Sequence, residues 1–131
     1  MTLLEYLVSY GVANGVLIGD GVDSFRDFMP PSPDSVVAFH EYAGDPVSPF
    51  TSAVHRSVQV KVRDVSAEAA RTKALQVVGI FKSSTEDLRI NFSGDTWGQV
   101  YIRQMPFKLE HDESDRVTYC FNLGITTNII E

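Results

Sequence analysis

Residues 57–81 read SVQVKVRDVSAEAARTKALQVVGIF, and this stretch decides the fold. Apolar and polar side chains alternate from Ser57 to Val65, which predicts a strand with one buried face. The alternating residues are Val58, Val60 and Val62 against Gln59, Lys61 and Arg63. Ser66 then suits a helix N-cap, and apolar residues recur at helical spacing up to Phe81. The stretch therefore predicts a strand followed by a helix whose apolar face lies on a sheet.

The flanking sequence predicts one more helix and four more strands. The helix is expected over Leu3–Val12 with Thr2 as N-cap, and the strands over Ser35–Tyr42, Leu88–Phe92, Gly98–Met105 and Arg116–Ile130. The acidic stretch from His111 to Asp115 is expected to be the last hairpin loop. Successive hairpins favour antiparallel pairing. We therefore expect an α+β fold, a mostly antiparallel sheet of four to five strands packed by two helices, in a single domain over residues 1–131.

Composition narrows the class of protein. The chain has 131 residues and one cysteine, so a disulfide within the chain and a cysteine-based zinc cluster are both excluded. The N-terminus lacks the basic start of a signal peptide, and the apolar stretches are too short for a membrane span, so we expect a soluble protein made in a reducing cytoplasm. A net charge of −6 disfavours a nucleic-acid-binding domain, because such domains gather basic charge.

The reactive residue types form no recognisable catalytic or metal-binding pattern. His40, His55 and His111 lie far apart, and His40 and Glu41 would point to opposite faces of a strand. Cys120 is expected on the polar side of the last strand, as a structural cysteine. The acidic cluster at Asp112, Glu113 and Asp115 lacks calcium-loop spacing, and Arg56, Lys61 and Arg63 are expected to form a modest basic patch on a polar sheet face. We assign no catalytic, cofactor-binding or metal-binding residue.

A long loop over residues 43–56 is the most distinctive irregular segment. It contains Gly44 and two prolines, and loops of this length in compact domains are usually functional or disordered. Exposed apolar residues tend to mark interaction sites. The candidate subunit-interface residues are therefore Pro46, Val47, Pro49, Phe50 and Arg56. An equally open alternative is that Phe50 folds back onto the core of its own chain.

Several segments, in order along nearly the whole chain, resemble the phage tail-terminator and minor capsid proteins. They include Leu3–Leu7, the turn Met29–Asp34 leading into Val36–Gly44, the strand and helix from Val58, and the segment Gln104–Phe107 followed by Arg116 and Phe121–Leu123. One departure is Ala43, where the family pattern suggests a second glycine. The resemblance implies a sheet backed by two helices and a ring, typically of six subunits, that caps the tail tube and docks onto the head.

The resemblance also implies the partners. These would be further copies of the chain, the tail tube protein and a neck or head-completion protein, with DNA passing through the lumen unbound, no cofactor and no membrane. Three alternatives stay open at this point. They are a head-completion or adaptor protein of the neck, a small enzyme of unknown chemistry, and a monomeric binding module that uses the 43–56 loop.

Overall fold

The fold consists of two helices and one six-stranded sheet. The computed structural model describes residues 1–46, 49–82 and 89–131. Its elements are α1 (Leu3–Ala13), β1 (Ser24–Arg26), β2 (Val36–Tyr42), β3 (Val54–Asp64), α2 (Ala67–Phe81), β4 (Arg89–Ser93), β5 (Thr96–His111) and β6 (Val117–Thr127). Both predicted N-caps are present. Thr2 and Glu5 form a capping box, and the Ser66 hydroxyl accepts a hydrogen bond from the Ala69 amide at 3.1 Å.

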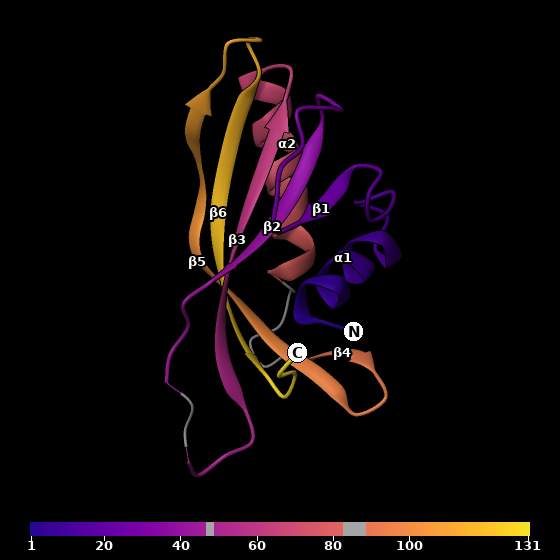
Figure 1. Ribbon diagram of the computed structural model, residues 1–131, viewed down its shortest axis with the longest axis vertical. Coiled ribbons are helices and arrows are strands. Elements are labelled where there is room, and N and C mark those ends of the chain that lie inside the picture. The colour runs from indigo at the N-terminus through magenta and orange to yellow at the C-terminus, as the bar shows by residue number, and fades with distance from the viewer. Residues whose placement is uncertain (47–48, 83–88) are drawn as a thin grey trace.

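The strand order is β1-β2-β3-β6-β5-β4 (Figure 1). All neighbours pair antiparallel except β1 and β2, which are parallel. The α+β class is as predicted, but the expectation of four to five antiparallel strands is corrected to six strands in a mixed sheet. The strand that the sequence does not reveal is β1, because three residues between glycine- and aspartate-rich turns carry no periodic signal.

Two predicted boundaries are also corrected. β3 begins at Val54, so the irregular connection after β2 ends earlier than expected. β5 continues to His111 through Pro106, which the register shifts along this strand accommodate. The last hairpin loop therefore starts at Asp112. The predicted strand from Leu88 is present as β4, although Leu88 itself lies outside the described residues.

The core lies between one face of the sheet and both helices. Residues of α1 and α2 join the same cluster as the inward face of β2, β3 and β6. The sheet curls so that β4 also reaches this cluster through Ile90, and the Phe92 ring stacks on Tyr6 of α1 with centroids 5.4 Å apart. The members from the central strands are Val37, Phe39, Val58, Val60, Val62, Phe121, Leu123 and Ile125. Burying these side chains is the main stabilising contribution to the fold.

The other face of the sheet carries no helix among the described residues, yet it is not simply polar. Cys120 lies on this face, as alternation predicts, but it is fully buried between its neighbours Lys61 and Phe107. The Tyr101 ring covers Gly124 so closely that a Cβ there would lie 2.2 Å from the ring. Cys120 is therefore on the predicted side of β6, and it is buried there beside its neighbours in β3 and β5.

The predicted basic patch does not form. Arg56 points to the helix-bearing side of β3, away from Lys61, because the two residues are an odd number of positions apart. Arg63 is only 6% exposed and donates hydrogen bonds to the carbonyl oxygens of Pro33 and Asp34 at 2.6 and 3.3 Å. Arg63 therefore holds the loop that precedes β2 in place, and its charge is largely shielded from solvent.

Candidate assembly surface

The connection between β2 and β3, residues 43–53, extends beyond the end of the sheet and is called the arm here (Figure 1). Its described residues are exposed, apart from half-buried Ala53. Phe50 is 93% exposed. At this exposure, little apolar area of Phe50 is removed from water within its own subunit. The arm therefore presents apolar surface to the surroundings of the chain.

The root of the arm is a close approach between its two ends. The Asp45 amide donates to the His55 carbonyl oxygen at 3.3 Å. A Cβ at Gly44 would lie 2.3 Å from the same oxygen, so the backbones approach this closely only because residue 44 is glycine. His55 is further held by a 2.8 Å hydrogen bond between Nδ1 and the Thr126 hydroxyl of β6. The arm thus leaves the sheet from a fixed position.

Arg56 lies just inside this root and joins three parts of the chain. Its guanidinium forms a bidentate ion pair with Glu41 of β2, with a distance of 2.6 Å from Nη2 to Oε1. Nη1 donates to the carbonyl oxygens of Ile129 at 3.0 Å and Glu131 at 2.8 Å. The Glu131 oxygen also accepts from the Leu3 amide at 3.1 Å. We call Arg56, Glu41 and the two carbonyls the Arg56 clamp; it ties the arm root to the C-terminal segment and the start of α1.

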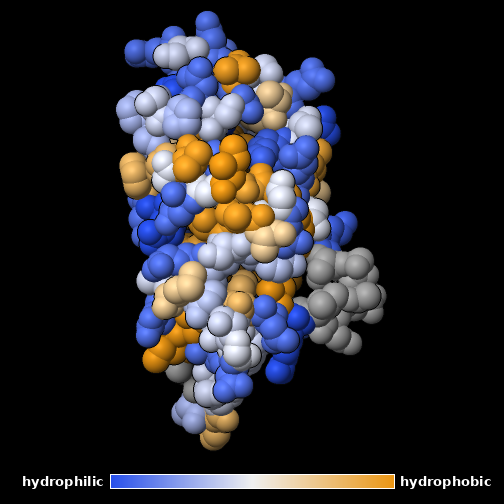
Figure 2. All heavy atoms as spheres, turned by 90° about the vertical axis from the view of Figure 1, so that its right-hand side faces the viewer, coloured by the Kyte–Doolittle hydropathy of each residue, from blue (hydrophilic) through white to orange (hydrophobic). Residues whose placement is uncertain are grey.

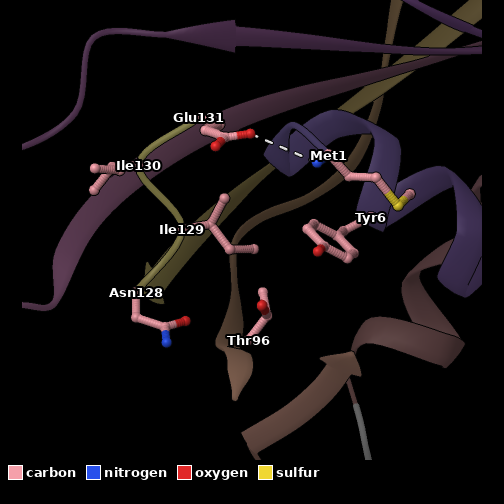
Figure 3. Close-up of a pocket in the computed structure, with 7 residues that line it drawn as sticks. All are labelled: Met1, Tyr6, Thr96, Asn128, Ile129, Ile130 and Glu131. Carbon is pink, nitrogen blue, oxygen red and sulfur yellow. Dashed lines mark ion pairs between the residues drawn. The ribbon is translucent and has the colours of Figure 1, made fainter. Parts of the chain in front are cut away.

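Next to the clamp, the two chain termini line a hollow of about 190 Å³ (Figure 3). The Met1 amino group and the Glu131 carboxylate form an ion pair at 3.5 Å across one side of it. Asn128 links the hollow to the β4–β5 hairpin by accepting from the Trp97 amide at 2.9 Å and donating to the Asp95 carbonyl at 2.7 Å. The remaining lining residues are Tyr6, Thr96, Ile129 and Ile130.

The predicted interface residues separate into three groups. Pro46, Pro49 and Phe50 are on the exposed arm. Arg56 is only 16% exposed in its side chain and is engaged in the clamp, so it positions the arm from inside the subunit. Val47 lies outside the described residues. Sequence reasoning identified the arm from its length and its prolines, but the clamp depends on contacts between positions 73 and 75 residues apart.

Of the titratable residues considered from the sequence, His111 and Asp115 meet, with 3.2 Å between Nε2 and Oδ1 at the exposed tip of the last hairpin. Burial, with a smaller contribution from the charge of Lys61, lowers the pKa of His40. Burial also raises the pKa of the Cys120 thiol, which favours the unreactive neutral form. Asp112 accepts hydrogen bonds from the amides of Ser114 and Arg116 and pairs with the Arg116 side chain at 2.8 Å, so its carboxylate is occupied within the hairpin. Within the described ranges, no three metal-ligating side chains come together.

Sequence reasoning missed a second exposed surface, on β5. Tyr101, Met105, Phe107 and Leu109 are all between 39% and 52% exposed. The sequence contains a signal for this surface. Val100 and Ile102, at even-numbered positions, pack on the core, whereas the apolar residues after Gln104 are at odd-numbered positions. That change of phase coincides with the register shift between Ile102 and Gln104.

A family model described as bacteriophage tail terminator protein matches residues 12–129. This range includes all six strands of the described residues, the arm and the arm root. The chain belongs to the bacteriophage tail terminator family. It is therefore a phage tail structural protein and a component of the virion, as its resemblance to this family predicted. No individually curated protein matches the sequence. In the part of the chain that the structure describes, no helix has the length and apolar character needed to cross a membrane.

Proposed function

We propose that this tail terminator works as one subunit of a hexameric ring that ends the phage tail tube and joins the tail to the head. The family match supports a role at the end of the tail. The subunit would be made in the host cytoplasm and act without a cofactor, with neighbouring copies, the tube protein and a neck protein as its partners. A ring requires a heterologous contact, in which one surface of a subunit meets a different surface of the next.

The observation that carries this proposal is the arm held by its root. A flexible loop would lose much conformational freedom on binding, whereas an arm fixed at its base loses less. Gly44, His55 and the Arg56 clamp together set the direction in which the arm leaves the sheet. Pro46 and Pro49 restrict its backbone further. The arm, with Phe50 near its end, is suited to reach a neighbouring subunit or the tube.

Duplex DNA would pass through such a ring without being held. Six copies at −6 each would sum to about −36, and an acidic collar repels phosphate. A nitrocellulose filter assay at low salt tests this part, since tight retention of duplex by the assembled ring would contradict it.

The arm is tested by the substitution Phe50→Ser. Because Phe50 is almost fully exposed, the thermal midpoint of the monomer should stay within a few degrees of wild type. Assembly, measured by sedimentation velocity alone and with purified tail tubes, should be reduced at least tenfold. Leu75→Ser, at a 41% exposed position on α2, is the matched control and should assemble normally. Unchanged assembly of Phe50→Ser would remove the arm from the proposal.

A further inference from the structure

We propose that neighbouring subunits meet through two defined flanks, with β5 of one copy lying against the α1–β1 side of the next. This inference rests on the proposed ring and adds the surfaces that form its contact. The β5 flank is the part of β5 from Val100 to His111. The α1–β1 flank is residues 12–28, from the end of α1 through β1. The arm is a separate surface, and this contact adds to the one that the arm makes.

Among residues 1–46, 49–82 and 89–131, the β5 flank is a long open edge of the sheet. The described part of β4 pairs with β5 up to Gln99, and beyond that point β6 is the one described strand that pairs with β5. At about 3.4 Å per residue this open edge is roughly 40 Å long. Met105, Phe107 and Leu109 are 52%, 39% and 42% exposed along it. Exposed apolar residues along a sheet edge are unusual unless another surface covers them.

The α1–β1 flank is the second apolar surface. Figure 2 views the side of the molecule that carries α1 and β1, and apolar side chains gather across its middle. Ile18 is 74% exposed, Val22 54% and Val12 39%. The turn that presents Ile18 and Val22 is rigid, because the Asp23 carboxylate accepts from the amides of Ile18 and Gly19 at 3.0 and 3.1 Å. These side chains are therefore held outward at a fixed place and are suited to pack against a partner.

The two flanks carry opposite charge. The β5 flank has Arg103 and Lys108 against Glu110, a formal charge of +1. The α1–β1 flank has three carboxylates, those of Asp20, Asp23 and Asp27, against Arg26, a formal charge of −2. Opposite charge at a contact favours the pairing of unlike surfaces and disfavours β5 against β5. This favours the head-to-tail contact that a ring needs over a two-fold dimer.

The contact is made by side chains and does not extend the sheet from one subunit to the next. Pro106 lacks an amide hydrogen, and three register shifts between Ile102 and Glu110 interrupt the regular edge of β5. On the other flank the outer edge of β1 is occupied by its own turn, where the Gly21 amide donates to the Ser24 carbonyl at 2.8 Å. The chain thus blocks strand pairing at both edges while leaving apolar side chains exposed there.

The positions of the flanks fit a closed ring. β1 is the edge strand on one side of the sheet, and β5 lies toward the other side, next to the edge strand β4. Figure 1 shows the part of β5 beyond β4 at about the same level along the long axis as β1. Copies related by rotation about an axis parallel to that direction would bring the β5 flank of one to the α1–β1 flank of the next. The arm would project at the lower end of such a ring.

Cysteine cross-linking tests this contact. Leu109→Cys and Ile18→Cys are made singly and together, and each protein is treated with a short bismaleimide, alone and on tail tubes. Val22→Cys with Met105→Cys is a second pair. The buried Cys120 should not react. Each double variant should give a ladder of covalent oligomers that ends at the ring size, and each single variant should stay monomeric on a denaturing gel.

Three results would overturn the proposal. Covalent dimers from a single variant would indicate a two-fold contact. If native mass spectrometry shows rings but neither double variant gives a ladder, the two flanks are not the contact, although the proposed ring is still supported. If no oligomer forms alone or on tubes, the ring of the proposed function fails as well.

A matched pair of substitutions measures how much the contact contributes. Leu109→Gln on the β5 flank should weaken assembly about tenfold, which corresponds to about 1.4 kcal/mol. Leu75→Gln, with a nearly equal exposure of 41% against 42%, lies on α2 outside both flanks and should leave assembly unchanged. Equal effects of the two substitutions would contradict the assignment of the β5 flank.

Discussion

Replacing Arg56 with methionine should destabilise the subunit and loosen its N-terminus at the same time. The substitution keeps most of the aliphatic length of the side chain but removes both hydrogen bonds to Glu41 and those to the carbonyls of Ile129 and Glu131. The Leu3 amide donates to the same Glu131 oxygen, so a freed C-terminal segment also deprives α1 of a partner for its first amide.

The size of the effect follows from the exposure of the partners. A hydrogen bond to a charged group contributes about 1.5–3 kcal/mol net, and Arg56 makes four. The Arg56 and Glu41 side chains are 16% and 32% exposed, however, so water partly replaces what is lost. We therefore expect a loss of about 2–3 kcal/mol in the free energy of unfolding. For a chain of this size that corresponds to a thermal midpoint lower by roughly 10 °C.

Urea denaturation gives the free energy, and amide hydrogen exchange at Leu3 gives the local effect. Glu41→Gln should cost less, about 1 kcal/mol, because the amide still accepts a hydrogen bond from the guanidinium. Arg71→Met, on an exposed position of α2, is the matched control and should change stability by less than about 0.5 kcal/mol. Equal stability of Arg56→Met and Arg71→Met, with unchanged exchange at Leu3, would refute the clamp.

Three further predictions concern the arm root and the helix-free face. Gly44→Ala should lower the free energy of unfolding, measured in urea, by about 1–3 kcal/mol, because the new Cβ would lie 2.3 Å from the His55 carbonyl oxygen. An unchanged urea midpoint would mean that the two strands of the arm root separate without cost. Burial and the Lys61 charge lower the pKa of His40 below its ordinary 6.5, so the stability that neutral His40 contributes is present above that value and is lost as the pH falls through the lowered pKa. His40→Gln should therefore lose less stability than wild type between about pH 7 and pH 5, and equal losses would count against this explanation. Iodoacetamide should label Cys120 only on unfolding, because the thiol is fully buried and burial raises its pKa; labelling of the native protein at the rate of a free thiol would contradict that.

The parts of the fold that the sequence predicted are those with a local physical cause. Thr2 and Ser66 cap helices through contacts only three residues away. The alternation around Val60 identifies the buried face of β3 without reference to any other strand. For these elements short-range pattern and long-range packing agree, so the pattern was sufficient.

The parts that the sequence did not predict depend on contacts between distant segments. β1 exists because residues 24–26 pair with β2, and nothing within three residues indicates that pairing. Alternation placed Cys120 on the correct side of β6 but could not show that Phe107 and Lys61 flank it in neighbouring strands. The local sequence places Arg56 at the end of a loop, and it cannot show the partners of this residue, because the carbonyls of Ile129 and Glu131 lie at the far end of the chain.

Electron microscopy of the protein mixed with purified tail tubes tests the central claim most directly. If the chain closes into a ring through unlike surfaces, every tube end that lacks its head should carry one closed cap of rotational symmetry, and further copies should not stack on it. Bare tube ends at saturating protein, with the chain remaining monomeric in native mass spectrometry, would contradict the account.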